Sequence, residues 1–181
     1  VFEFNPNGTG IQAPTDTASG NYSTAMGRYT EASGNYSTAM GYNTETSGLY
    51  STAMGHSPEA SGYSSTAMGY QTEAIESSST AMGKFGKARG ESSFVIGTNV
   101  LPNDSTVANG ESSIAIGKQC VSLGISSIAI GSNTRAAGNY SIAMGNNGEA
   151  TGTRSITMGI NSNATGTGSR AFGNYCLASA E

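Results

Sequence analysis

The chain has 181 residues, of which 36% are hydrophobic and 11% are charged, against about 45–50% and about 25% in ordinary globular domains. Its formal net charge of -4 gives no basic surface for nucleic acid, and no apolar run approaches the roughly 18 residues of a membrane span. Such a composition is typical of disorder, but the strict periodicity of the chain argues against it.

The first segment, residues 1–17, is irregular. It contains two turn-like runs, Asn5-Pro6-Asn7-Gly8 and Ala13-Pro14-Thr15-Asp16, which combine residues that favour turns. We expect either a cap over the open end of a repeat domain or a flexible leader. The repeat domain itself is expected over residues 18–181.

The repeat is carried by the pentapeptide Ser-Thr-Ala-Met-Gly, which ends at Gly27 and again at Gly41. The glycine recurs every fourteen residues, except for one step of twenty between Gly97 and Gly117. Two turn signals and two Thr- and Tyr-rich stretches in fourteen residues predict two short strands per coil. A helical repeat needs about 33 residues. The sequence therefore predicts an all-β parallel roll, with the six additional residues forming a loop near 98–105.

Side chains alternate along a strand, so the Thr and Met columns face one side and the Ser and Ala columns the other. The Met column is never polar, and we expect Thr and Met to fill the inside of the roll. Ser and Ala are then expected to point outward and to line the interface of a homotrimer; the alternative is an exposed Ser/Ala face on a monomer. The interface candidates are Ser23, Ala25, Ser37, Ala39, Ser51, Ala53, Ser113, Ala115, Ser127 and Ala129.

A second glycine column, which includes Gly34, is expected at backbone positions with positive φ.

Two further columns are candidates for binding. Tyr22, Tyr36 and Tyr50, with Tyr140 later, suit contact with a protein or a glycan, or equally with a neighbouring subunit. Like charges that stack one per coil raise each other's pKa or collect cations. The acidic column is therefore a candidate for a weak divalent-cation ladder, against the alternative of a solvated acidic edge; its members are Glu31, Glu45, Glu59 and Glu73.

The sequence contains no pattern typical of an enzyme. The single histidine, His56, cannot alone make a metal site or a catalytic triad, and we interpret it as a solvent-facing turn residue. No Gly-Lys-Ser/Thr follows the glycines, so no phosphate loop is indicated. We therefore expect no catalytic residues and no cofactor. Cys120 and Cys176 lie four coils apart, too far for a bridge within one regular roll. They are either small buried residues or partners in an intermolecular bond.

Ser113-Ile114-Ala115-Ile116-Gly117 and Ser127-Ile128-Ala129-Ile130-Gly131 resemble the head repeat of the YadA-type trimeric autotransporter adhesins. The resemblance covers roughly residues 18–181. It implies a left-handed parallel β-roll, a tight homotrimer and a position outside the cell, on a cell or virion surface. The function that it implies is adhesion to host-surface or matrix molecules, protein or glycan, through multivalent contacts. The alternatives are a viral or phage fibre segment and a filament built by end-to-end stacking.

Overall fold

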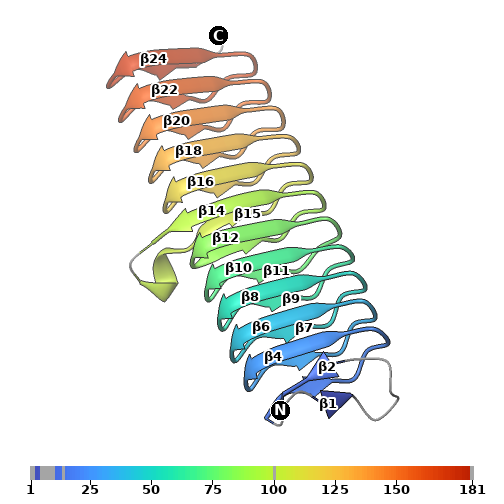
Figure 1. Cartoon of the computed structure of the whole chain (residues 1–181). Coiled ribbons are helices and arrows are strands. Elements are labelled where there is room, and N and C mark those ends of the chain that lie inside the picture. The colour runs from blue at the N-terminus through green and yellow to red at the C-terminus, as the bar shows by residue number, and fades with distance from the viewer. Residues whose placement is uncertain (1–2, 5–10, 14, 100, 180–181) are drawn as a thin grey trace.

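The chain forms a β-solenoid whose coils stack from the N-terminus to the C-terminus (Figure 1). The computed structural model describes residues 3–4, 11–13, 15–99 and 101–179. About half of the segment 1–17, over which a cap or leader is expected, lies outside the described residues. Among those that are described there is no α-helix, and no helix is long and apolar enough to cross a membrane. The predicted all-β roll is confirmed.

Two sheets make up the solenoid. Sheet A has thirteen strands: β1 (Glu3–Phe4), β2 (Ile11–Gln12), β4 (Thr24–Arg28), β6 (Thr38–Tyr42), β8 (Thr52–His56), β10 (Thr66–Tyr70), β12 (Thr80–Lys84), β14 (Phe94–Thr98), β16 (Ile114–Lys118), β18 (Ile128–Ser132), β20 (Ile142–Asn146), β22 (Ile156–Ile160) and β24 (Arg170–Asn174). Sheet B has twelve shorter strands: β3 (Thr17–Ala18), β5 (Glu31–Ala32), β7 (Glu45–Thr46), β9 (Glu59–Ala60), β11 (Glu73–Ala74), β13 (Gly86–Ala88), β15 (Thr106–Ala108), β17 (Val121–Ser122), β19 (Arg135–Ala136), β21 (Glu149–Ala150), β23 (Asn163–Ala164) and β25 (Leu177–Ala178).

All neighbouring strands pair in parallel except β1 and β2, and equivalent residues of successive coils stand opposite each other. Met26 pairs with Met40, and Ala25 with Ala39. We call the turn that leads from sheet B into a strand of sheet A the leading turn, and the turn that leaves that strand the trailing turn. Each sequence column thus becomes a straight row along the solenoid.

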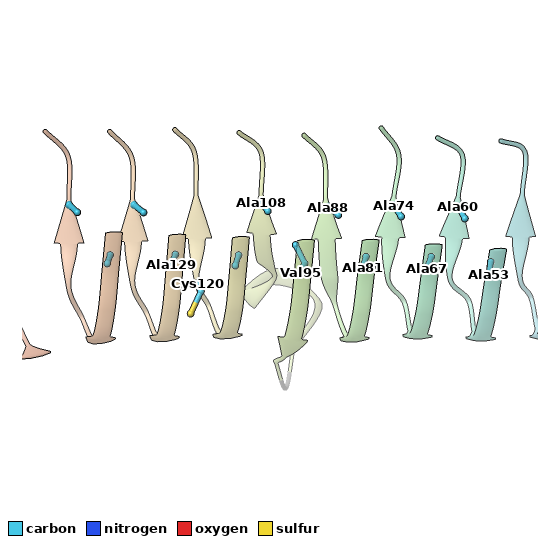
Figure 2. Close-up of a cluster of buried hydrophobic side chains, with 14 residues drawn as sticks. Ala53, Ala60, Ala67, Ala74, Ala81, Ala88, Val95, Ala108, Cys120 and Ala129 are labelled. Atoms are coloured by element: carbon cyan, nitrogen blue, oxygen red, sulfur yellow. The ribbon is translucent and has the colours of Figure 1, made fainter. Parts of the chain in front are cut away.

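The inside of the roll is filled with alanine. Ala25 of sheet A and Ala32 of sheet B are both fully buried, and Figure 2 shows the equivalent alanines of later coils, such as Ala67 and Ala60, on the strands of the two sheets. Because alanine faces alanine, the sheets approach closely, and the larger Val95 fits where Gly86 leaves room beside it. Val95 is the largest of the fully buried side chains.

The expected direction of the side chains on sheet A is therefore wrong. The alternation was predicted correctly, but its phase is inverted: serine and alanine point inward, and threonine and methionine point outward. The proposed interface residues have at most 1% of their surface exposed in a single chain, so they cannot contact another subunit. They are Ser23, Ala25, Ser37, Ala39, Ser51, Ala53, Ser113, Ala115, Ser127 and Ala129.

The recurring serine has its own role inside the leading turn. The Ser23 hydroxyl donates to the Gly20 carbonyl oxygen at 2.7 Å, and Ser51 and Ser127 make the same bond three residues back. A buried hydroxyl needs such a partner. In some coils the equivalent hydroxyl is buried without one; these are Ser65, Ser113, Ser141, Ser155 and Ser169.

The two glycine columns are required for different reasons. Gly41, the fourth residue of β6, has a φ of 129°, which side chains rarely tolerate. Gly34, in the leading turn, is not at positive φ, contrary to the sequence expectation. A Cβ there would collide with the carbonyl of Gly48 in the next coil. Gly34 is therefore required by the close approach of two backbones.

The N-terminal end of the stack and the coil with the inserted loop depart from the regular pattern. Strands β2 and β3 already pair with β4 and β5, so both sheets extend slightly before residue 18. Asp16, which is buried, accepts hydrogen bonds from the N–H groups of Gly27 and Thr30 at 2.7 and 3.0 Å. The loop expected near 98–105 contains a short 3-10 helix, η1 (Pro102–Asp104), and projects from the trailing side (Figure 1).

The narrow interior makes a testable prediction. We expect Ala67→Leu to destabilise the protein by about 1–3 kcal/mol, because the extra side-chain volume must force the sheets apart. Val121→Thr, on the outward face of sheet B, should change stability by no more than about 0.5 kcal/mol. Urea unfolding at equal protein concentration measures both. A well-tolerated Ala67→Leu variant would contradict an interior closed at alanine width.

Candidate interaction surface

The outward face of sheet A presents two columns of side chains that the roll itself cannot bury. All seven methionines of the chain stand in one column, which isoleucine and phenylalanine complete: Met26, Met40, Met54, Met68, Met82, Ile96, Ile116, Ile130, Met144, Met158 and Phe172. The second column changes from threonine to isoleucine: Thr24, Thr38, Thr52, Thr66, Thr80, Phe94, Ile114, Ile128, Ile142 and Ile156. These side chains are mostly half-exposed, and they form a continuous strip.

The tyrosines predicted from the sequence form a row along the leading turns. The rings of Tyr22 and Tyr36 stack with their centroids 5.2 Å apart, and Tyr36 and Tyr50 stack at 5.1 Å. Tyr63 continues the row edge-on, at 5.8 Å from Tyr50. Parallel strands about 4.8 Å apart place identical rings at stacking distance. Tyr140 is exposed but stacks on no other ring among the described residues.

The backbone of this row is held in an unfavourable conformation. Tyr22, Tyr36 and Tyr50 have φ values of 56–60°, in the left-handed region that a side chain normally avoids. Hydrogen bonds between coils hold them there, since the Tyr36 N–H donates to the carbonyl of Asn21 at 2.8 Å. The turns are therefore part of the continuous backbone ladder, and the rings project from fixed positions.

A second aromatic row, along the trailing turns, was not predicted from the sequence. His56 lies between the rings of Tyr42 and Tyr70, with both centroid distances 4.9 Å. Tyr29 and Phe85 meet the two ends of this row edge-on. His56 was expected to be a solvent-facing turn residue, and it is exposed, but its ring faces are covered. The sequence does contain the signal for this row. Tyr42, His56 and Tyr70 occupy the same position of the fourteen-residue repeat, and Tyr29 and Phe85 occupy the next position.

A cation lies at each end of this trailing row. The Arg28 guanidinium lies 4.8 Å from the centroid of the Tyr29 ring, and Lys84 lies 5.6 and 5.4 Å from the rings of Tyr70 and Phe85. Cation–π contacts of this length are favourable.

The acidic column stands on the outward face of sheet B. Glu31, Glu45 and Glu59 are opposite each other in successive coils. Burial, together with the charges of Glu59 and Glu31, raises the pKa of Glu45. No group of three metal-ligating side chains occurs among the described residues, so the structure gives no support to a cation ladder.

Glu73, the last member of the acidic column, has cationic partners. Its carboxylate contacts Lys87 at 2.7 Å and Arg89 at 2.8 Å. Burial alone would raise the pKa of Glu73, but the hydrogen bonds and positive charges of Lys87 and Arg89 outweigh it and lower the pKa. The same column thus contains a repulsive and an attractive arrangement.

Beyond the inserted loop the trailing side becomes polar. The Asn133 amide donates to Asn147 at 2.6 Å, and Asn147 donates to Asn161 at 3.0 Å. Beside them Arg135 and Glu149 form an ion pair of 2.6 Å. The amides and the ion pair border a shallow hollow of about 310 Å³. The aromatic and amide rows therefore occupy different halves of the same side.

The two cysteines are unpaired in the single chain. Cys120 is buried, and its thiol lies 3.2 Å from the carbonyl oxygens of Ile116 and Gly131. Cys176 is partly exposed in the last described coil. Cys120 thus occupies an inward position that threonine or serine takes in other coils.

The acidic column predicts a pH dependence of opposite sign at two positions. The raised pKa means that folded protein binds a proton at Glu45 more tightly than unfolded protein does. This penalty on stability is full above the folded pKa and is relieved as the pH falls below the usual 4.5. Glu45→Gln should therefore raise the urea midpoint at pH 7, with the gain disappearing by about pH 3.

Glu73→Gln is the matched control. The lowered pKa of Glu73 contributes stability above pH 4.5 that is lost as the pH falls through the folded value. This variant should have a lower midpoint at pH 7, and the loss should disappear in acid. Both differences should shrink in 1 M salt, because these groups are partly exposed. Shifts of the same sign at pH 7 would contradict the electrostatic account.

The repeats match a known protein family. The profile described as the YadA head domain repeat (2 copies) matches residues 17–30, 32–57, 60–85, 104–119, 122–147 and 150–175, which together are more than half of the chain. The unmatched stretch between 85 and 104 contains β14 and most of the inserted loop. Comparison with curated proteins gave no match. Head domains of this family are surface-exposed parts of adhesins and are associated with trimer formation. The chain belongs to the YadA-type head domain family.

Proposed function

We propose that the chain is an adhesive head displayed outside the cell as a homotrimer. Three rolls pack the outward face of sheet A around a threefold axis, and the outward face of sheet B remains available to host-surface or matrix molecules. Each contact with such a molecule is weak, and three copies acting together provide the affinity.

The observation that carries this proposal is the apolar strip on sheet A. In β16 and β18 both outward columns are isoleucine, at Ile114, Ile116, Ile128 and Ile130. The roll cannot bury these side chains because its interior is closed by alanine. A contiguous apolar strip on a soluble protein marks an interaction surface, and identical copies in a closed ring cover such strips completely.

The first test is the oligomeric mass. We expect the wild-type protein to be a trimer by light scattering, and Ile116→Asp to be a monomer, because three carboxylates would meet in an apolar environment. Val121→Asp is the matched control, since Val121 is half-exposed on the outward face of sheet B, and this variant should remain trimeric. A monomeric wild-type protein, or a trimeric Ile116→Asp variant, would refute the proposed face.

The second test concerns adhesion. On a panel of immobilised matrix proteins and host-cell glycans, the wild-type trimer should bind its target about 10²–10⁴-fold more tightly than the Ile116→Asp monomer, because multivalent contact is lost. Ile116→Val, which keeps the strip apolar and the protein trimeric, should bind as tightly as the wild type. Equal binding by monomer and trimer would show that multivalent contact does not contribute to the affinity.

Electron microscopy tests the filament alternative. Long unbranched filaments of the purified protein would indicate a filament subunit and contradict the adhesive head.

A further inference from the structure

The two aromatic rows stand at opposite ends of the same strands of sheet A. Strand β6 begins shortly after Tyr36 and ends at Tyr42, and strand β8 begins shortly after Tyr50 and ends at His56. All four side chains are exposed in the single chain, and β10 follows the same pattern. Over these coils the outward face of sheet A is bordered by aromatic rings on both sides.

Both borders become charged further along the roll, and the charges are of opposite sign. Glu91 and Glu111 occupy the leading turns before β14 and β16, while Lys84 and Lys118 end β12 and β16. All four side chains are exposed. None of the four belongs to an ion pair among the described residues. Between β12 and β16 the leading side is therefore acidic at Glu91 and Glu111, and the trailing side is basic at Lys84 and Lys118.

We propose that these two sides form a heterologous seam between copies, in which the leading side of one copy packs against the trailing side of the next. This inference rests on the proposed trimer and assigns the residues that hold its corners. Three flat sheets that face one axis enclose a triangular prism, and at each corner two different sides meet. A ring closed by rotation alone permits no shift along the roll. Residues at the two ends of the same strand are therefore matched, and of the four charges only Glu111 and Lys118 stand at the two ends of one strand, β16.

The stacking within each row favours a neighbouring copy over a small planar ligand. Tyr36 has Tyr22 on one ring face and Tyr50 on the other, and both faces of His56 are covered by Tyr42 and Tyr70. On Tyr36 and His56 only the ring edges and the Tyr36 hydroxyl remain free. Aromatic rings favour edge-to-face and offset contacts, so a second row can approach edge-on. A ligand that stacks on aromatic rings, such as a sugar, would need a free ring face there.

The decisive experiment is a charge exchange at one level. Glu111→Lys and Lys118→Glu each place like charges across the seam, and each should raise the dissociation constant of the trimer roughly tenfold, because the change recurs at three corners. The double variant should restore it. Glu111 and Lys118 stand at opposite ends of β16 and form no ion pair in one chain. Restoration can therefore occur only between copies.

A crosslinking experiment tests the aromatic part of the seam. In a Cys120→Ser, Cys176→Ser background, Tyr36→Cys combined with Tyr42→Cys should give covalent dimers and trimers after mild diamide oxidation. The two positions are at opposite ends of β6, beyond the roughly 7 Å Cα separation that a disulfide within one chain allows. Each single variant should stay uncrosslinked. So should the control that pairs Tyr36→Cys with Asn146→Cys in β20, several coils away.

The outcomes separate this seam from the trimer itself. A wild-type protein that is monomeric overturns the proposed function and the seam together. A wild-type trimer with no restoration in the charge exchange and no crosslinked species overturns the seam alone. In that case the exposed tyrosines are available to another partner, and their replacement by serine should weaken adhesion without changing the mass.

Discussion

The separation of the two sheets is the constraint on which the rest of this structure depends. Alanine from sheet A faces alanine from sheet B, as in Ala25 and Ala32, and the interior admits little more. Interiors are packed at nearly crystalline density, so the methionine and isoleucine side chains of sheet A must stand outside. The strip of methionine and isoleucine on sheet A is a consequence of that narrow core. The apolar area that the roll cannot bury in its own core therefore stays on its outward face.

The parallel, in-register stacking amplifies each residue choice. One tyrosine in the repeat becomes a row of stacked rings, one glutamate becomes a repulsive column, and one asparagine becomes a chain of amide hydrogen bonds through Asn133, Asn147 and Asn161. In an ordinary fold these residues would be scattered and their interactions would be local. Here the residue at one position of the repeat determines whether neighbouring coils attract or repel each other at that position. The acidic column contains both cases, because Glu45 is repelled by Glu31 and Glu59 whereas Glu73 pairs with Lys87 and Arg89.

The period of the repeat was sufficient to predict the solenoid, its fourteen-residue coils and its inserted loop, because a fixed period allows few architectures. The direction of the side chains was not predictable by the same means. Alternation fixes which residues share a face, but Ser23 and Ala25 could be assigned inward only by knowing the sheet separation. The usual preference of large apolar residues for the core gave the wrong answer, since this core is too thin for them. The tyrosine row was found because its residue is constant, whereas the trailing row mixes tyrosine, histidine and phenylalanine.

The backbone ladder connects each coil only to the coils before and after it, with equivalent residues fourteen positions apart. Loss or duplication of one unit would therefore change the height of the head by a single layer and leave its cross-section intact. The units from β4 to β12 are nearly identical in sequence. Loss or duplication of one of these units would therefore disturb the fold least. The length of the roll can then vary in discrete steps, independently of the side chains displayed in any one coil.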